Sequence, residues 1–257
     1  MSRFSYAARR LQATLQVSLL AWSVSGPCAA LVGPAREDAA ASSHVVMVLI
    51  RNAGKAGFCS GVVLAPNVVL TAGHCARPAG DMRIFYRDAG GAAVFIPVRA
   101  VEAHPGFRAN AVARRVESVD LALVELATPL DARFSAAVID DSGGASLGQD
   151  ILVAGFGVAR EGEQSSAGVL RSVKLAVRAP LSRILIWAED PSGSGGGGCV
   201  GDSGGPIFSA VGAKLLAITA WSEGKIGSHC GALTQGVLIA PALDWIGKTI
   251  ERWRTGR

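Results

Sequence analysis

Residues 199–206 read C-V-G-D-S-G-G-P, the most informative stretch of this 257-residue chain. Ser203 lies between small residues, as a nucleophile on a tight turn requires, because glycine lets a substrate and backbone N–H groups approach closely. A serine hydroxyl is a weak nucleophile and needs an adjacent base, usually histidine, which in turn needs an orienting carboxylate. The stretch therefore predicts a matching histidine and acidic residue elsewhere in the chain.

Among the four histidines, His74 has the most suitable setting for a base. It stands in T-A-G-H-C at 71–75, directly after an apolar run, and the neighbouring Cys75 could fix its backbone. The remaining histidines have no such scaffold and are interpreted as surface or turn residues: His44, His104 and His229. A purely structural role is the alternative for His74.

The candidate carboxylate is Asp120, which opens the apolar run D-L-A-L-V-E-L at 120–126. A charged residue at the start of a buried strand is costly unless it is paired. It can be accommodated if it accepts a hydrogen bond from a histidine Nδ1–H. For this segment alone, an aspartate exposed to solvent at a strand end explains the pattern equally well.

Residues 1–30 are predicted to form a secretory signal peptide. Three arginines and no acidic residue precede an apolar run at 11–24, which ends in small residues before Ala30. That run is short for a membrane span, so we expect a secreted protein, extracellular or periplasmic, without a stable membrane anchor. An uncleaved anchor is the alternative.

The net charge of +5 depends largely on this leader. Without it, 22 basic residues face 20 acidic ones, and no Lys/Arg-rich run or basic aromatic patch remains. We therefore expect no nucleic-acid partner. The sequence offers no recognisable calcium loop and no oligomer interface, and we expect a monomer without cofactor or metal.

Five cysteines become four once Cys28 is assigned to the leader. The pairs Cys59–Cys75 and Cys199–Cys230 are one of three connectivities. Each would close a loop of 16 to 31 residues, worth about 3 kcal/mol in the chain-entropy model. Disulfides suit an oxidising compartment, whereas metal binding, the alternative, lacks a close C-x-x-C pair.

Many short apolar runs and 32 glycines favour an all-β fold. About a dozen short strands suggest a barrel or sandwich in two six-stranded units. Residues 54–57 and 193–198 are read as a turn and a loop, and apolar residues at helical intervals predict a helix over 241–253. The predicted strands are 44–50, 60–64, 68–71, 82–86, 93–101, 121–126, 151–155, 170–177, 184–188, 207–209, 215–221 and 236–239.

Taken together, the sequence resembles the chymotrypsin-like (trypsin-fold) serine endopeptidases from residue 31 to the end. The matching segments are T-A-G-H-C, D-L-A-L-V-E-L, A-G-F-G at 154–157, C-V-G-D-S-G-G-P, A-W-S at 220–222 and W-I at 245–246. The resemblance implies a protease domain over 31–257 with two antiparallel six-stranded Greek-key barrels, roughly 31–135 and 136–240, and a C-terminal helix. The active site would lie in the cleft between them.

By this resemblance Ser203 would be the nucleophile, His74 the base and Asp120 the residue that orients it. The N–H groups of Gly201 and Ser203 would form the oxyanion hole. Substrates would be proteins or peptides, and a protein inhibitor could occupy the same cleft. One alternative is a non-catalytic homologue that binds a partner, although such proteins typically lose a triad residue. A G-D-S lipase is another, but its serine lies early in an α/β chain.

One departure from the family concerns activation. Family members usually carry a free amino terminus reading I-V-G-G, which inserts beside the aspartate that precedes the serine. Here L-V-G-P stands at 31–34, with Pro34 in place of a glycine. Cleavage after Ala30 would create an activating Leu31 ammonium that pairs with Asp202. Removal of a short propeptide, for instance by cleavage after Arg36, is the alternative.

A second departure concerns specificity. Six residues before the nucleophile, where trypsin-like enzymes have an aspartate, this chain has Gly197. Ser222 and Gly236, both small, are the other expected pocket residues. We therefore predict cleavage after uncharged, small to medium apolar residues. Ala220 replaces a serine that often bonds the triad aspartate, so we expect Asp120 to be held by fewer hydrogen bonds.

Overall fold

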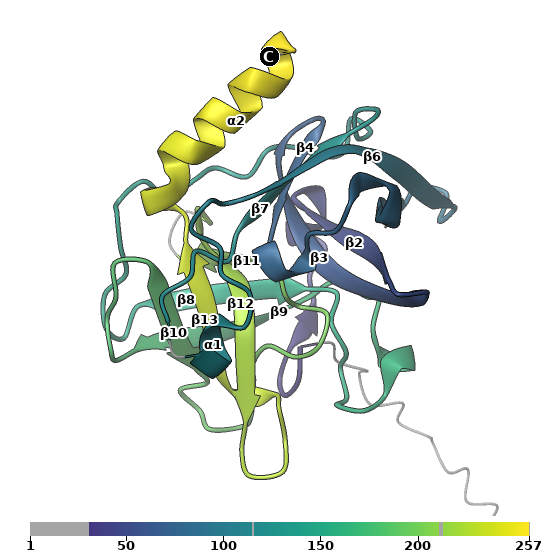
Figure 1. Ribbon diagram of the computed structural model, residues 1–257. Helices are drawn as coiled ribbons and strands as arrows, with labels where there is room; N and C mark the ends of the chain where they lie inside the picture. The colour runs from purple at the N-terminus through teal and green to yellow at the C-terminus, as the bar shows by residue number, and fades with distance from the viewer. Residues whose placement is uncertain (1–30, 115, 211–212, 257) are drawn as a thin grey trace, which may run out of the picture.

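The computed structural model describes residues 31–114, 116–210 and 213–256, which form two β-barrels side by side (Figure 1). The predicted signal peptide lies outside the described residues. None of the described helices combines the length and the apolar character that crossing a membrane requires.

The first barrel is a closed ring of six antiparallel strands in the order β2-β3-β4-β7-β6-β5, where β5 pairs with β2. Its β5 alternates buried and exposed residues, as a strand with one face in a core does. All of β7 is buried. The strands are β2 (Val45–Asn52), β3 (Lys55–Ala65), β4 (Val68–Thr71), β5 (Met82–Arg87), β6 (Ala93–Ala103) and β7 (Ala122–Leu126).

The second barrel contains six antiparallel strands in the order β9-β10-β13-β12-β11-β8, and a β8–β9 pairing closes the ring. The two-residue β1 (Arg36–Glu37) adds to β9 from outside. These findings confirm the predicted all-β fold. The strands are β8 (Asp150–Gly155), β9 (Arg171–Arg178), β10 (Leu185–Glu189), β11 (Pro206–Ser209), β12 (Leu215–Gly224) and β13 (Gly231–Leu238).

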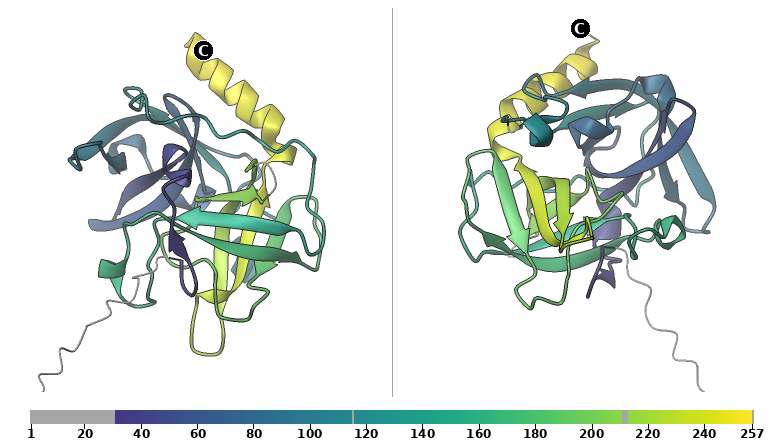
Figure 2. Two further views of the ribbon diagram at one scale, coloured as in Figure 1. Left: turned by 180° about the vertical axis from the view of Figure 1, so that it is seen from behind. Right: turned by 60° about the horizontal axis from the view of Figure 1, so that its bottom comes forward.

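The carboxyl-terminal helix α2 (Leu243–Thr255) leaves the second barrel after β13 and lies along the outside of the molecule (Figures 1 and 2). Its Trp245 and Thr249 donate hydrogen bonds to Glu102 on β6, so the helix bridges both barrels. The remaining described helices are α1 (Ala111–Arg114) and five 3-10 helices, η1 (Ala41–Ser43), η2 (Gly73–Cys75), η3 (Ala79–Asp81), η4 (Gln164–Ser166) and η5 (Ala240–Ala242).

Several element boundaries differ from the predicted ones, most of all at the starts of β3 and β13. Residues 55–57, predicted as part of a turn, already belong to β3, because β2 and β3 pair as far as Asn52 and Lys55. Strand β13 begins at Gly231 rather than 236, because its pairing with β12 extends to Gly224. The helix predicted from residue 241 begins at Leu243, after the 3-10 turn η5.

The barrels share one hydrophobic core cluster. It contains Val48 and Leu123 of the first barrel together with Phe208, Leu215 and Ile218 of the second. Buried contact between the barrels therefore fixes how residues on either side of the cleft face one another.

Candidate active site

His74 and Asp120 form a close pair on the first barrel. His74 lies in η2, directly after β4, and Asp120 lies just before β7, the strand that pairs with β4. Asp120 Oδ2 is 2.7 Å from His74 Nδ1, and its Oδ1 accepts the His74 backbone N–H at 2.7 Å. The carboxylate therefore fixes both the backbone and the ring of His74.

Asp120 receives both of its described hydrogen bonds from His74. Ala220 stands where family members often have a serine. It lines one cleft together with Asp120 but has no side-chain donor to offer the carboxylate. Asp120 keeps its side chain 18% exposed, whereas that of His74 is 41% exposed. The Nε2 edge of the ring is thus left to face the cleft.

Ser203 comes from the second barrel and lines the same cleft, which has a volume of about 1000 Å³. The cleft also contains His74 and Asp120, so the structure brings the predicted triad residues together. In the described residues no hydrogen bond joins Ser203 Oγ to the His74 ring. Such bonds are often long in the absence of substrate.

The turn that carries Ser203 is anchored to the first barrel through Ser60 on β3. The Ser60 N–H donates to the Ser203 carbonyl at 2.8 Å, and its hydroxyl donates to the Gly201 carbonyl at 2.9 Å. The same hydroxyl accepts the Phe156 N–H at 2.9 Å. Ser60 is completely buried, and no local sequence pattern indicates this role.

Two N–H groups of this turn are available for an oxyanion. Asp202, Gly204 and Gly205 donate their N–H groups to carbonyls, whereas those of Gly201 and Ser203 donate to no described residue. Gly201 has a φ of +96°, and a Cβ there would overlap the Phe58 ring. Only glycine therefore fits this position.

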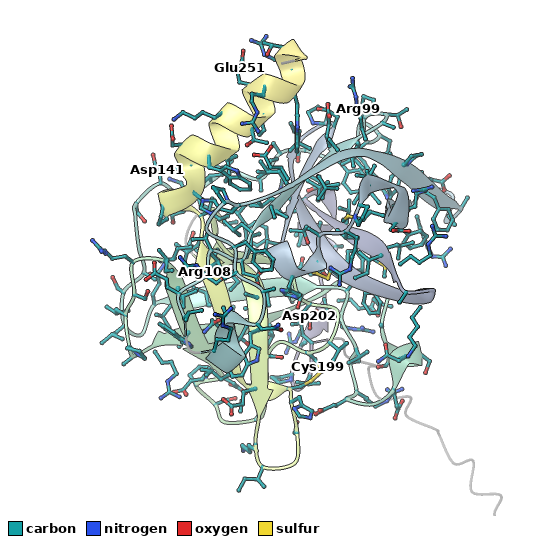
Figure 3. The ribbon with its side chains drawn as sticks, in the orientation of Figure 1. Arg99, Arg108, Asp141, Cys199, Asp202 and Glu251 are labelled. Atoms are coloured by element: carbon teal, nitrogen blue, oxygen red, sulfur yellow. A yellow bond between two sulfur atoms is a disulfide. The ribbon has the colours of Figure 1, made fainter. Side chains whose placement is uncertain are left out.

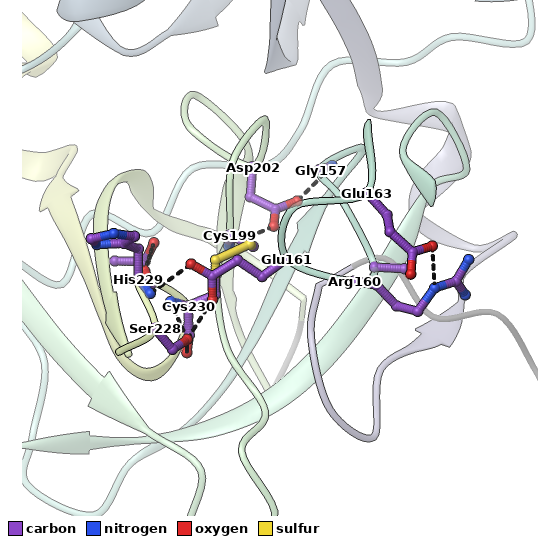
Figure 4. Close-up of a disulfide and its surroundings, with 12 residues drawn as sticks. Gly157, Arg160, Glu161, Glu163, Cys199, Asp202, Ser228, His229 and Cys230 are labelled. Atoms are coloured by element: carbon purple, nitrogen blue, oxygen red, sulfur yellow. Dashed lines mark hydrogen bonds and ion pairs between the residues drawn. A yellow bond between two sulfur atoms is a disulfide. The ribbon is translucent and has the colours of Figure 1, made fainter. Parts of the chain in front are cut away.

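Asp202 points away from the cleft into the second barrel and is fully buried. Its carboxylate accepts the Gly157 N–H at 2.8 Å and the Cys199 N–H at 2.9 Å (Figure 4). Burial raises the pKa of Asp202 to about 7, against the opposing influence of these two donors and of the Arg171 charge. Asp202 and Cys199 lie close together in Figure 3.

The segment 31–33 packs against residues 195–197, which precede Asp202 in the chain. Leu31 is fully buried, and Val32 forms a bridge with Gly197, whose N–H donates to the Val32 carbonyl at 3.3 Å. A Cβ at Gly33 would overlap the backbone of residues 195–196. Leu31 and Asp202, the predicted activation pair, are thus both fully buried.

Of the three predicted pocket residues, Ser222 lines the described cleft, whereas Gly197 and Gly236 do not. Gly197 is buried, with Thr234 beside it, and Ser222 lines the cleft as expected. Gly236 does not line the cleft: a Cβ there would point at Ile186 and Ile207 in the second barrel. Thr234 lies beside Gly197 instead, because the register of β13 on β12 pairs Thr234 with Ser222 and Gly236 with Thr219.

Thr234 packs against the segment that contains Gly197 and Gly198. Its side chain is 1% exposed, and its Oγ1 accepts the Gly198 N–H at 2.9 Å. Thr234 Oγ1 also lies 3.2 Å from a Cβ position built at Gly197. No charged side chain takes part in these contacts, and the threonine occupies space that a glycine would leave open.

Both proposed cysteine pairs are disulfides in the structure. Cys59–Cys75 fixes the segment around His74, and Cys199–Cys230 ties the residues before Ser203 to the start of β13. Cys59, His74 and Cys75 place their side-chain ligand atoms within 4.8 Å of one another. Because both sulfurs are in the disulfide, they are not thiolate ligands, and the cluster does not fit a metal site.

A carboxylate outside the predicted site joins two loops next to the pocket (Figure 4). Glu161 Oε1 accepts the His229 N–H at 2.8 Å, and its Oε2 accepts the Ser228 hydroxyl. The His229 carbonyl accepts the Ser222 hydroxyl at 3.2 Å, which connects the loop to the cleft wall. Glu161 lies in a polar surface loop, where sequence patterns give no positional signal.

Comparison with known proteins agrees with the resemblance. A family model described as Trypsin matches residues 34–246. A curated trypsin of Saccharopolyspora erythraea is 29% identical over 203 residues, covering 73% of this chain and 86% of that protein. A chymotrypsin-like elastase family member 1 of Macaca fascicularis is 26% identical over 212 residues, covering 75% and 78%.

Solved structures share the fold. The structure of mouse neuropsin, a serine protease expressed in the limbic system of the brain, superposes with a TM-score of 0.67 at 20% identity. It covers 85% of this chain and 99% of neuropsin. A structure described as GrC gives a TM-score of 0.70 at 21% identity and covers 86% and 99%.

Proposed function

Because the chain belongs to the trypsin family and is a serine endopeptidase, we propose that Ser203, His74 and Asp120 carry out its reaction. The observation that supports this most directly is the Asp120–His74 pair facing Ser203 across one cleft. Asp120 selects the tautomer in which Nδ1 carries the proton, so Nε2 is free to act as the base.

The reaction proceeds in two halves. Ser203 Oγ attacks the substrate carbonyl carbon while the hydroxyl proton moves to His74 Nε2. The oxyanion that forms accepts hydrogen bonds from the N–H groups of Gly201 and Ser203. The carbon–nitrogen bond then breaks as His74 returns the proton to the leaving amine. Water, deprotonated by His74, hydrolyses the acyl-enzyme and releases the carboxylate product with Ser203 regenerated.

A fluorophosphonate probe tests this assignment. We expect it to label the wild type and to fail on Ser203→Ala. Asp120→Asn should lower kcat/KM by about 10⁴-fold, a magnitude taken from serine proteases with this triad. Labelling that persists in Ser203→Ala would contradict the proposal. We do not favour a non-catalytic binding homologue, because the residues for each catalytic role are present.

We propose that the enzyme cleaves after uncharged, small to medium apolar residues. Support comes from the neighbours of Gly197 itself, which are Gly231 and the uncharged Thr234, and from the space that Thr234 occupies. A peptide-library profile should give its strongest signals for such residues at the position before the scissile bond. A profile dominated by Arg and Lys would overturn this specificity.

We also propose that the domain begins at Leu31 and is secreted, with signal cleavage releasing an ammonium that pairs with Asp202. The buried position of Leu31 and the Val32–Gly197 bridge support this over cleavage after Arg36, which would remove both residues. Amino-terminal sequencing of active secreted enzyme should begin at Leu31. Any other start would contradict it.

A further inference from the structure

Arg171 is a buried cation with no assigned role. It is the first residue of β9 and is only 2% exposed. Its Nε and Nη1 atoms are buried without a hydrogen-bond partner among the described residues. A guanidinium cannot lose its proton in a protein, so this charge requires an anion nearby.

The register of the second barrel places Arg171 on the face of β8 and β9 over which Asp202 lies, without a described hydrogen bond between them. Arg171 pairs with Gly155 on β8, and directly opposed residues of an antiparallel pair have their side chains on the same face. On that face, a Cβ at Gly155 would overlap Asp202 Oδ1. The Asp202 carboxylate therefore lies over the cross-strand partner of Arg171.

The other acidic groups are less suitable as partners. Among the described carboxylates only Asp202 and Glu125 are buried, and Glu125 lies on β7 of the first barrel, where Arg99 reaches it. Glu37, which pairs with Arg171 from β1, is exposed. The buried cation and the buried anion thus share one region of the second barrel.

In the 257-residue chain the Leu31 nitrogen belongs to a peptide bond and carries no charge. Asp202 nevertheless belongs to the turn whose Gly201 and Ser203 N–H groups face the cleft and donate to no described residue. Arg171 is the cation whose charge stabilises ionised Asp202 in this state.

We propose that Arg171 is a positioning residue: a permanent countercharge that holds the Asp202 carboxylate, and with it the oxyanion-hole turn, before a new amino terminus forms. This inference rests on the function proposed above and adds a statement about its regulation. Processing would then increase an activity that the unprocessed domain already has, rather than create it.

Two forms of the domain test the proposal. One begins at Leu31 and the other carries two additional residues before it, so that Leu31 stays in a peptide bond. Each form is made as wild type, Arg171→Met, Arg171→Lys and Lys174→Met, a matched control on an exposed position of β9. Fluorophosphonate labelling rate and kcat/KM on a peptide with an uncharged cleaved residue are measured for folded protein.

We expect the labelling rate of the extended wild type to lie within about tenfold of the rate of the form that begins at Leu31. Arg171→Met should slow the extended form by about 100-fold or more, because a buried charge loses its partner. The same change should slow the Leu31 form far less, since its ammonium can pair with Asp202. Arg171→Lys should restore much of the lost rate, and Lys174→Met should change neither form.

An extended wild type that is inactive while the Leu31 form is active would overturn the inference and leave the proposed function intact. Equal losses in both forms of Arg171→Met would overturn it too, because they indicate a general structural role. If Arg171→Met does not fold, the comparison of the two wild-type forms still decides. Absence of labelling in both wild-type forms would instead refute the proposed function.

Discussion

At the scale of single residues, Ser60 connects the two halves of the site. It is a buried residue of the first barrel whose hydroxyl and N–H bond the turn that carries Ser203. Its hydroxyl also satisfies the Phe156 N–H. One residue therefore positions the proposed nucleophile against the barrel that carries the proposed base.

Replacing Ser60 with alanine should destabilise the protein by about 2–3 kcal/mol, because a buried N–H at Phe156 loses its acceptor. The displaced turn should also lower kcat more than it raises KM. Thermal unfolding and steady-state kinetics measure these effects. Ser42→Ala, an exposed position whose hydroxyl bonds only Ala39, serves as the control. Unchanged stability in Ser60→Ala would contradict this role.

The sequence predicted the residues whose setting is local. His74, Asp120 and Ser203 each stand in a short recognisable segment, and the strand runs carry their own alternation. Ser60, Thr234 and Glu161 were missed, since their roles depend on partners far along the chain. The position of Gly236 has the same origin, because it depends on the register of β13 on β12, which pairs Gly236 with Thr219.

At the scale of elements, α2 is held by one carboxylate of β6. Glu102 accepts hydrogen bonds from Trp245 at 3.2 Å and Thr249 at 3.0 Å, and it also pairs with Arg252. Burial opposes the ionisation of Glu102, but these hydrogen bonds outweigh it and lower its pKa below the ordinary 4.5. The helix is thereby docked through an ionised group.

Glu102→Gln should lower the free energy of unfolding at pH 7 by about 1–2 kcal/mol. Because the folded-state pKa of Glu102 is the lower one, the unfolded chain binds more protons below pH 4.5. The stabilisation is therefore complete above that pH and disappears as pH falls. Denaturant unfolding across this range should show the variant and wild type converging. A constant difference would contradict the assignment, and Glu251→Gln on the exposed face is the control.

The loop element beside the pocket offers a second prediction. Glu161→Gln weakens the connection to Ser228 and His229 and so loosens the segment that contacts Ser222. We expect KM to rise by about two- to fivefold with kcat nearly unchanged, the size typical of an exposed interaction. Glu163→Gln in the same loop, whose partner is Arg160, should leave KM unchanged. Equal effects of both variants would contradict a specific role for Glu161.

At the scale of the whole molecule, the two barrels share a common core in addition to the segment 127–149 that connects them. The cluster that contains Leu123 also contains Leu215 and Ile218. Neither barrel can unfold without exposing apolar surface of the other. The protein is therefore expected to behave as one cooperative unit.

Urea unfolding should give a single transition. The described tryptophans all lie in the second half, at Trp187, Trp221, Trp245 and Trp253, so their fluorescence follows the second barrel and α2. Amide exchange in β4 and β7 follows the first barrel. We expect both probes to lose their native signal at the same denaturant concentration. Separate midpoints would show that the barrels unfold independently.

The distribution of His74, Asp120 and Ser203 over two barrels also has a consequence during synthesis. The ribosome completes the first barrel, with its base and carboxylate, well before it adds Ser203 near the end of the chain. With Ser203 as the proposed nucleophile, a nascent chain that lacks it cannot attack a peptide bond, and translation order therefore keeps a half-made polypeptide from cutting its neighbours.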